Sequence, residues 1–307
     1  MARSALSVGR HRGSGARAAL VAACLSLLAL SALLSHLALL ALSAPALAQA
    51  SGPQRIVSIN QCADELLLRL ADRDRIASVT YFSRDAANSN VTALGEGIPV
   101  NHGLAEEIMS YRPDVVLAGA YSSQTAVQVL RRLGVRVVAF DAPRTMDDVR
   151  AQIRGIAAAI GEPARGEAMV REIDAGLAAF PPPAPPLRAI VMQPNGFTVD
   201  KGSLVEELMK RAGLDNLASR IEAGSYLSIP LEAVALQEAD VMILNGEVYD
   251  APSLATEALN HPIIAALGRR LKVISIAPKL WTCAGPNLVD AVRSLIAQTR
   301  GAGAAMR

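Results

Sequence analysis

Aromatic residues follow the short apolar runs of this sequence. The chain has ten aromatic residues, namely five Tyr, four Phe and one Trp. Seven of them lie at the end of a run that predicts a β-strand or within five residues after it: Tyr81, Phe82, Tyr121, Phe140, Phe197, Tyr249 and Trp281. Core packing would place most rings inside helices and strands, and it is the alternative for Phe82 and Phe140. Aromatic rings around a cleft, with a few polar groups, suit a sizeable and partly apolar small ligand.

Amide side chains also follow the first predicted strand, at Asn60 and Gln61. In open parallel sheets, ligands bind beyond the carboxyl ends of the strands, so residues that follow strands are the candidates for ligand contact. The predicted ligand-binding residues are Asn60, Gln61, Tyr81, Phe82, Tyr121, Phe197, Tyr249 and Trp281.

An acidic pattern occurs twice at a constant offset. Glu106 lies eight residues before Asp114, and Glu232 lies eight residues before Asp240, with an apolar run after each Asp. One interpretation is coincidence between two ordinary helix–turn–strand units. The other is two similar lobes, each with a carboxylate at a helix N-terminus, where the helix dipole favours a negative charge.

Motifs of established catalytic chemistry are missing from the sequence. It has no Gly-x-Ser-x-Gly elbow, no phosphate-binding loop and no His-Glu-x-x-His pattern. After residue 48 the only imidazoles are His102 and His261, and no Cys or His spacing of a structural zinc site exists. We therefore predict no catalytic residues, no metal-ligating residues and no cofactor.

The first 48 residues have the organisation of a secretory signal. Four Arg and no acid precede an uncharged apolar stretch over 18–48, which ends in Pro45 and an Ala-Leu-Ala box. This pattern predicts a signal peptide over 1–48, cleaved after Ala48, and hence an exported protein. The alternative is a permanent membrane anchor, because the stretch exceeds the ~20 residues that span a bilayer. Pro45, just before the small-residue box, favours cleavage.

Removal of this segment changes the charge of the protein. The full chain has 30 basic and 28 acidic residues and a net charge of +2. The chain from residue 49 has 26 basic residues and a net charge near −2. The basic excess therefore belongs to the N-terminal segment, and no nucleic-acid partner is expected.

Two cysteines follow the predicted signal peptide, Cys62 and Cys283. Because disulfides persist in exported proteins, this even number favours a bridge between them. Two separate thiols are the alternative.

Strand-like and helix-like segments alternate in both halves of the chain. Apolar runs over 55–59, 76–80, 115–118 and 136–140 alternate with helical patterns, and runs over 188–192, 241–244 and 272–276 do so again. Such alternation indicates βαβ units and mainly parallel sheets. We predict an α/β protein of two Rossmann-like lobes, residues 54–142 and 188–300.

The segment 143–180 separates these lobes and has apolar residues at helical spacing, which predicts one long linking helix. Gly161-Glu-Pro163 predicts a kink or a short break, because Pro lacks the N–H that an internal turn requires. The Pro-rich run over 181–187 cannot continue a helix and predicts a stiff spacer.

Together these segments resemble the periplasmic substrate-binding proteins of cobalamin and iron-chelate ABC transporters, the helical-backbone class (class III). The resemblance rests on 55–70, 75–80, 112–118 and 134–140 in the first half, and on 202–217 and the Glu232 unit in the second. It spans about residues 54–298.

The resemblance implies a solute receptor that captures a large chelate between its lobes and delivers it to an inner-membrane permease and its ATPase. It implies that Glu106 and Glu232, one in each lobe, dock onto arginines of the permease through charge-assisted contacts. It also implies little hinge motion, and we expect a monomer.

The ligand class is predicted from the scarcity of basic residues near the strand ends, where Arg84, Arg144 and Lys201 are the nearest. This scarcity favours cobalamin, a large and nearly neutral chelate, over an anionic siderophore, while haem and siderophores are the alternatives. A periplasmic enzyme or assembly factor with the same two-lobed fold is the alternative function.

Overall fold

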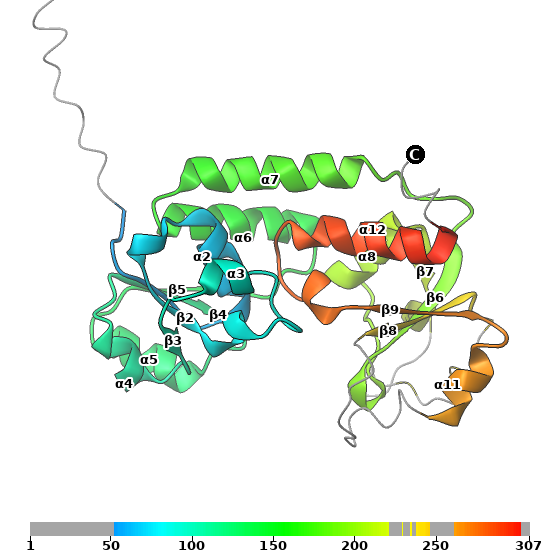
Figure 1. Ribbon diagram of the computed structural model, residues 1–307, viewed down its shortest axis with the longest axis horizontal. Helices are drawn as coiled ribbons and strands as arrows, with labels where there is room; N and C mark the ends of the chain where they lie inside the picture. The colour runs from blue at the N-terminus through cyan, green and yellow to red at the C-terminus, as the bar shows by residue number, and fades with distance from the viewer. Residues whose placement is uncertain (1–51, 221–228, 230–233, 235–237, 246–260, 302–307) are drawn as a thin grey trace, which may run out of the picture. The chain divides into compact units, whose positions relative to one another are not determined.

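The structure of the chain is a computed structural model (Figure 1). The chain divides into two units, Met1–Ser51 and Gly52–Arg307. The structure describes residues of the second unit, namely 52–220, 229, 234, 238–245 and 261–301. Within these ranges, no helix has the length and apolar character that a membrane span requires.

The first lobe contains a parallel sheet of five strands in the order β3-β2-β1-β4-β5. Its strands are β1 (Ile56–Ser58), β2 (Ile76–Thr80), β3 (Val100–Asn101), β4 (Val115–Gly119) and β5 (Val137–Phe140). Its helices are α2 (Gln61–Leu70), α3 (Thr92–Gly95), α4 (Ala105–Ser110) and α5 (Gln124–Arg132), with 3-10 turns at Arg73–Arg75 and Tyr81–Arg84.

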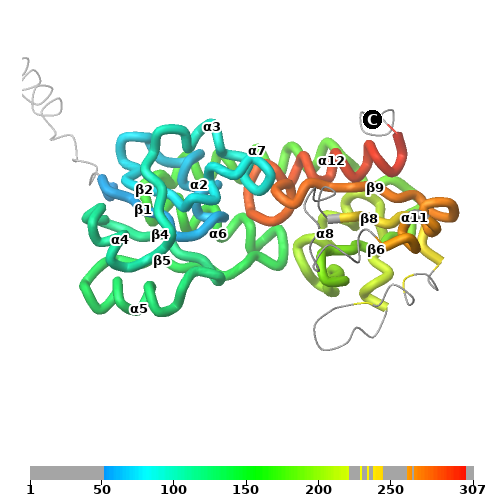
Figure 2. The backbone as a smooth tube through the Cα atoms, turned by 60° about the horizontal axis from the view of Figure 1, so that its bottom comes forward, coloured from blue at the N-terminus to red at the C-terminus, as the bar shows by residue number. Residues whose placement is uncertain are grey.

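The second lobe contains a parallel sheet of four strands in the order β7-β6-β8-β9. Its strands are β6 (Leu187–Met192), β7 (Leu214–Asn216), β8 (Val241–Asn245) and β9 (Lys272–Ile276). Its described helices are α8 (Leu204–Arg211), α11 (Pro262–Leu267) and α12 (Asn287–Arg300), with 3-10 turns at Pro194–Gly196, Leu217–Arg220 and Pro278–Leu280. Figure 2 shows both sheets with their helices.

The two sheets repeat one arrangement. In each lobe the first strand in sequence lies between the second strand and a later one, because β1 lies between β2 and β4, and β6 lies between β7 and β8. The last strand, β5 or β9, then pairs with β4 or β8. The predicted α/β class with two parallel sheets is confirmed.

The repeated Asp has the same role in both lobes. The Asp114 carboxylate accepts hydrogen bonds from the backbone N–H groups of Gln54 (2.7 Å) and Arg55 (2.9 Å), and its own N–H donates to the Arg55 carbonyl. The Asp240 carboxylate accepts from the Arg188 N–H (2.8 Å), and its own N–H donates to the Arg188 carbonyl. Each Asp fixes the start of one strand against its neighbour, which favours two similar lobes over coincidence.

The connection between the lobes is a pair of helices, α6 (Met146–Ala159) and α7 (Pro163–Ala178) (Figure 1). Gly161 has φ of +82°, a left-handed conformation that favours glycine. Pro163 begins α7 at a position where no N–H is needed. An ion pair between Arg150 and Asp174 (2.7 Å) joins the start of α6 to the end of α7.

The prediction of a single linking helix over 143–180 is therefore wrong, although the break at Gly161-Glu-Pro163 is present. The two helices are antiparallel, since the ion pair of Arg154 with Glu167 (2.6 Å) joins them nearer the reversal. Helical spacing and a break signal predict where a helix ends, but they do not predict the direction in which the next helix runs.

A buried arginine holds this reversal of the chain in place. Arg75 is 9% exposed, and its guanidinium donates to the Pro53 carbonyl (3.0 Å) and to the Ile160 carbonyl. It also forms an ion pair with Glu162. The start of β2 is thereby tied both to the turn between α6 and α7 and to the segment that leads into β1.

Alternate strand residues face two different cores. In β1, Ile56 enters a core with α2 and α6, whereas Val57 enters a core with α4 and α5. In β8, Val241 faces the side of α8 and α12, and Met242 faces the side of α11. The core that contains Ile56 continues through α7 to α8 and α12, so one apolar cluster connects both lobes.

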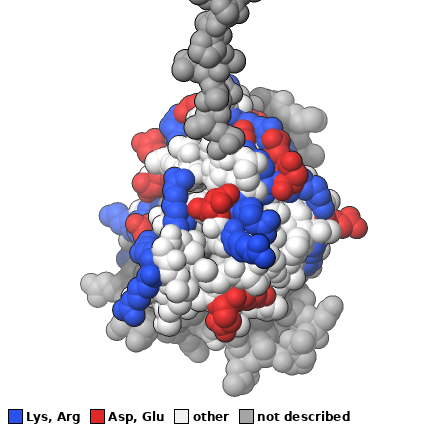
Figure 3. Space-filling model, turned by 90° about the vertical axis from the view of Figure 1, so that its left-hand side faces the viewer, with Lys and Arg blue, Asp and Glu red and all other residues white. Residues whose placement is uncertain are grey.

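Charged residues of both signs are scattered over the side of the first lobe that Figure 3 shows, where Lys and Arg are interspersed with Asp and Glu. Ion pairs of this lobe include Arg165 with Asp72 (2.7 Å). This face has no extended basic surface of the kind that nucleic acids require.

Two strands of the structure were not predicted, β3 and β7. They have two and three residues, so neither is long enough to show an alternating pattern. The runs over 76–80 and 272–276 have the predicted bounds. Glu232 and most of the helix predicted to begin there lie outside the described residues.

Candidate ligand-binding site

A cavity of about 440 Å³ lies at the carboxyl edge of the first sheet. Segments that follow all five strands of this sheet contribute to its wall. Within the described ranges, Thr282 is the one lining residue from the second lobe. The lining residues are Ile59, Asn60, Gln61, Cys62, Thr80, Tyr81, Phe82, Asn101, His102, Gly103, Gly119, Ala120, Tyr121, Ser122, Ser123, Phe140, Asp141, Ala142, Pro143, Gln152 and Thr282.

The two predicted amide residues lie in this wall and are held by α2. Asn60 caps the helix, because its Oδ1 accepts hydrogen bonds from the N–H groups of Cys62 (3.0 Å) and Ala63 (3.2 Å). A Cβ at Gly119 would lie 2.5 Å from the Asn60 side chain, so only glycine leaves room for it there. The Gln61 amide donates to the Asn88 carbonyl (2.6 Å).

Three predicted aromatic residues line the cavity. The rings of Tyr81 and Phe82 stack with centroids 4.2 Å apart, and Tyr81 also stacks on His102 at 5.4 Å. Tyr81 is 46% exposed, Phe82 is 36% exposed and Tyr121 is 89% exposed. Exposed large rings grouped at a cavity are a common feature of binding surfaces.

His102 is a lining residue that the sequence prediction missed. The carboxylate of Glu107, in the first turn of α4, accepts a hydrogen bond from the His102 backbone N–H (2.7 Å) and lies 3.4 Å from its Nδ1. His102 directly follows β3, so it obeys the same strand-end rule as the other lining residues. The two-residue strand before it gives no recognisable sequence signal.

Phe140 and Asp141 also line the cavity, and Phe140 packs against the core as well. Phe140 therefore both lines a cavity and packs in a core, which are the two roles considered for it from the sequence. Gln152 has no strand-end signal in the sequence, since it lies within α6, whereas Thr282 lies next to Trp281 in the loop that follows β9.

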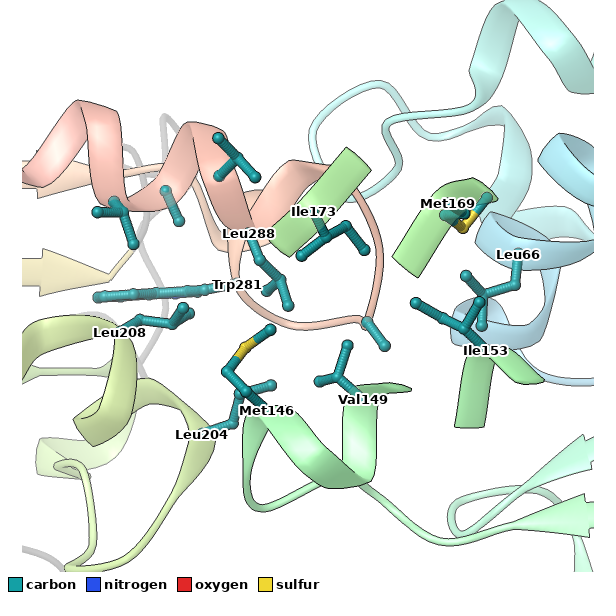
Figure 4. Packing of buried hydrophobic residues seen from close by; sticks show 14 of the residues in the cluster. Leu66, Met146, Val149, Ile153, Met169, Ile173, Leu204, Leu208, Trp281 and Leu288 are labelled. Atoms are coloured by element: carbon teal, nitrogen blue, oxygen red, sulfur yellow. The ribbon is translucent and has the colours of Figure 1, made fainter. Parts of the chain in front are cut away.

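Trp281 does not lie at this cavity. Its ring is 3% exposed and belongs to the apolar cluster shared by the lobes, where it lies beside Leu208 and Leu288 (Figure 4). The largest apolar side chain of the loop is thus used for packing between α8 and α12. We therefore exclude Trp281 from the candidate ligand contacts.

Phe197, another predicted aromatic residue, is not brought to the cavity either. Phe197 follows β6 and is 38% exposed, but it does not line the cavity. Tyr249 lies outside the described residues.

The predicted disulfide between Cys62 and Cys283 is present and links positions 221 residues apart. Cys62 lies in the first turn of α2, and Cys283 lies in the loop between β9 and α12. The bridge therefore joins the two lobes at the edge of the cavity.

A buried carboxylate lies behind the cavity wall. Asp64 in α2 accepts hydrogen bonds from the Thr80 N–H (3.2 Å) and from the Thr80 hydroxyl, and Thr80 lines the cavity. Burial raises the pKa of the Asp64 carboxyl from 3.8 to about 7, and hydrogen bonds from Ser58 and Thr80 offset part of this rise. Asp64 therefore positions Thr80, and its contribution to the stability of the folded protein depends on pH.

Of the two predicted docking glutamates, the structure describes Glu106. Glu106 is exposed in the first turn of α4, which starts just after the cavity-lining segment 101–103. Glu232 lies outside the described residues.

The cavity wall carries no Lys or Arg among the described residues, and Asp141 is its one acidic residue. The second-lobe segments 221–237 and 246–260 likewise contain neither Lys nor Arg in their sequence. In the described part of the chain, no group of three His, Cys, Asp or Glu side chains is arranged to hold a metal ion. The arrangement can bind a large, partly apolar ligand through aromatic contacts and a few amides and hydroxyls.

Similar proteins have been found by sequence and by structure. The chain is 25% identical over 216 residues to the cobalamin-binding protein of Halobacterium salinarum (strain R1), a match that covers 68% of this chain and 58% of that protein. The chain thus spans somewhat over half the length of this relative.

Solved structures show the same fold. The periplasmic heme-binding protein RhuT from Roseiflexus sp. RS-1 matches with a TM-score of 0.64 and 19% identity, over 81% of this chain and 100% of that one. The periplasmic vitamin B12 binding protein BtuF of Vibrio cholerae matches with a TM-score of 0.58 and 17% identity, over 81% of this chain and 97% of that one.

A family model for periplasmic binding proteins matches residues 56–267, which is more than half of the chain and includes strands of both sheets. The chain therefore belongs to the periplasmic binding protein family, whose members are binding proteins of the periplasm and not enzymes.

Proposed function

We propose that this protein is the solute receptor of an ABC importer and that it captures a large, nearly neutral metal chelate, with cobalamin preferred over haem or a siderophore. One observation carries the proposal: the cavity at the first sheet is lined by exposed aromatic rings and has no cationic side chain in its described wall. Such a wall suits a bulky ligand without strong negative charge.

The charge of the wall separates the candidate ligands. The carboxylates of haem and the anionic groups of many siderophores would need cationic partners, because an unpaired charge is costly to bury. Cobalamin is large and nearly neutral, and it can be held by ring contacts and by amides such as those of Asn60 and Gln61. The similarity to a cobalamin-binding protein supports this preference, while the similarity to a haem-binding protein keeps haem as the alternative.

The partner of the receptor is an inner-membrane permease with its ATPase. The exposed position of Glu106 at the start of α4 supports docking of the first lobe onto a basic surface of the permease. Glu232 is the proposed counterpart in the second lobe. The N-terminal pattern supports export by a signal peptide that is cleaved after Ala48, which releases a monomeric receptor.

We expect Tyr121→Ala to weaken binding of cyanocobalamin by roughly tenfold to a hundredfold, because loss of a stacked ring costs about 1–3 kcal/mol. Tyr81→Ala should have a similar effect, since it also removes the support of Phe82 and His102. Calorimetric titration measures both affinities.

Leu133→Ala is the control for these variants, because Leu133 is 57% exposed but lies away from the cavity. It should leave the affinity unchanged. Equal affinities for the wild-type protein and both tyrosine variants would show that the ligand binds elsewhere.

A further inference from the structure

We propose that the Cys62–Cys283 disulfide is a positioning element of the ligand site, which holds the second-lobe loop Pro278–Cys283 against the cavity before the ligand arrives. The bond joins the lobes at the cavity itself, since Cys62 lines the wall and Thr282, next to Cys283, is the described lining residue of the second lobe. The effect on affinity rests on the proposed function, whereas the effect on lobe position does not.

The loop that the disulfide holds is rigid within its own lobe. The Asn287 side chain donates hydrogen bonds to the carbonyls of Cys283 (2.9 Å) and Leu280 (3.1 Å). The Thr282 hydroxyl donates to the Pro278 carbonyl (2.7 Å), and Trp281 is buried in the shared core. A bond to Cys283 therefore fixes the second lobe as a whole, and not only a flexible loop.

Among the described residues, polar contacts also join the lobes near the disulfide. The Asn90 side chain donates to the Lys279 carbonyl (2.7 Å), and the Lys279 ammonium donates to the Ala86 carbonyl (2.7 Å). Glu65, buried in α2, accepts from the Asn90 N–H (2.7 Å) and so orients the segment that makes these contacts. Partly exposed hydrogen bonds are individually weak, so the disulfide is the strong connection at this edge.

The lobes are also joined through the apolar cluster that runs along α6 and α7. This connection would by itself allow the cavity edge to open by a hinge at the helices. The disulfide adds a covalent attachment at the edge of the cavity, and this attachment restricts opening of the lobes at that edge. The cavity is thereby preformed, and a preformed site binds more tightly because less ordering accompanies binding.

The test compares the wild-type protein with the double variant Cys62→Ser and Cys283→Ser. Spin labels at exposed positions of the two lobes, introduced as Arg131→Cys and Arg269→Cys in both backgrounds, report the distribution of interlobe distances. Titration of the unlabelled proteins with cyanocobalamin reports affinity. Far-UV circular dichroism verifies that the serine variant is folded.

The expected result is one narrow distance distribution with the disulfide and a broader one without it, together with roughly tenfold weaker binding by the serine variant. Chemical reduction of the wild-type protein should weaken binding equally and should not affect the serine variant. The same narrow distribution and the same affinity in both proteins would overturn the proposal, and so would a broader distribution with unchanged affinity.

If neither protein binds cyanocobalamin, the proposed ligand is contradicted. The distance distributions then decide the positioning role alone: a broader distribution in the serine variant supports it, and an unchanged one removes it.

Discussion

The double variant Glu106→Ala and Glu232→Ala is expected to abolish stimulation of the importer's ATPase while ligand affinity stays at the wild-type value. Removal of one partner of a buried charge pair at an interface costs about 2–5 kcal/mol, and two such losses exceed what a transient complex can tolerate. ATPase rates of the reconstituted transporter and calorimetric titration of the receptor measure the two quantities.

A charge-matched control removes one exposed acid from each lobe at other positions, Glu96→Ala with Glu238→Ala. This pair should leave stimulation intact. If the control reduces stimulation as much as the test pair does, the change in net charge causes the loss of stimulation. Full stimulation by the test pair would remove both docking residues from the account.

The Asp64→Asn variant is expected to lose much less stability than the wild-type protein as the pH rises from about 4 to about 7. Burial raises the pKa of Asp64 in the folded protein to about 7, whereas its ordinary pKa is 3.8. Below pH 3.8 both states hold the proton and the contribution to stability is fully present. Between these values only the folded state holds it, so stability falls with rising pH and the contribution is lost above pH 7.

The loss assigned to Asp64 is at most roughly 4 kcal/mol, from about three pH units at 1.36 kcal/mol each. Urea unfolding at pH 4, 5.5 and 8 gives the free energy of unfolding of wild type and of Asp64→Asn. The loss assigned to Asp64 is the amount by which wild type falls relative to the variant as the pH rises. Parallel pH profiles for the two proteins would contradict a buried, protonated Asp64.

Asp148→Asn provides a control of opposite sign. Hydrogen bonds from the Arg144 N–H, and then from Thr145, hold the pKa of Asp148 below its usual value. Its contribution to stability is therefore present at neutral pH and is lost as the pH falls. The stability that wild type has in excess of Asp148→Asn should shrink toward acid pH, whereas the stability of wild type relative to Asp64→Asn should fall toward alkaline pH.

The sheets could be predicted because most of their strands are short runs rich in apolar residues. Ile76–Thr80 and Lys272–Ile276 have the same bounds in the sequence prediction and in the structure. The repeated Asp also indicated a repeated lobe, although its function is structural: Asp114 and Asp240 bind the backbone of a neighbouring strand. The repeated Asp thus predicted two similar lobes correctly, but the sequence alone does not show that its role is to bind the backbone of the next strand.

The reversal between α6 and α7 could not be predicted, because it depends on contacts between residues distant in sequence. The break at Gly161 and Pro163 is a local signal, but the antiparallel arrangement depends on Arg75 and on ion pairs across the two helices. Helical periodicity contains no information on such pairs.

The candidate site was predicted where the strand-end rule applied to recognisable strands, as for Tyr81 and Tyr121. His102 was missed because the strand before it has two residues. Trp281 was included because it follows a strand, but the rule does not indicate whether a side chain points to the cleft or into the core. The packing of α8 and α12 around Trp281 decides that it is buried.

The central claim is that the aromatic cavity of the first lobe selects a large and nearly neutral chelate. Native mass spectrometry of the mature protein with an equimolar mixture of cyanocobalamin, haemin and a ferric tris-catecholate tests this claim in one measurement. The predicted result is a dominant one-to-one complex with cyanocobalamin in the wild-type protein, which is lost in Tyr121→Ala. A dominant complex with haemin or the anionic ferric chelate would contradict it.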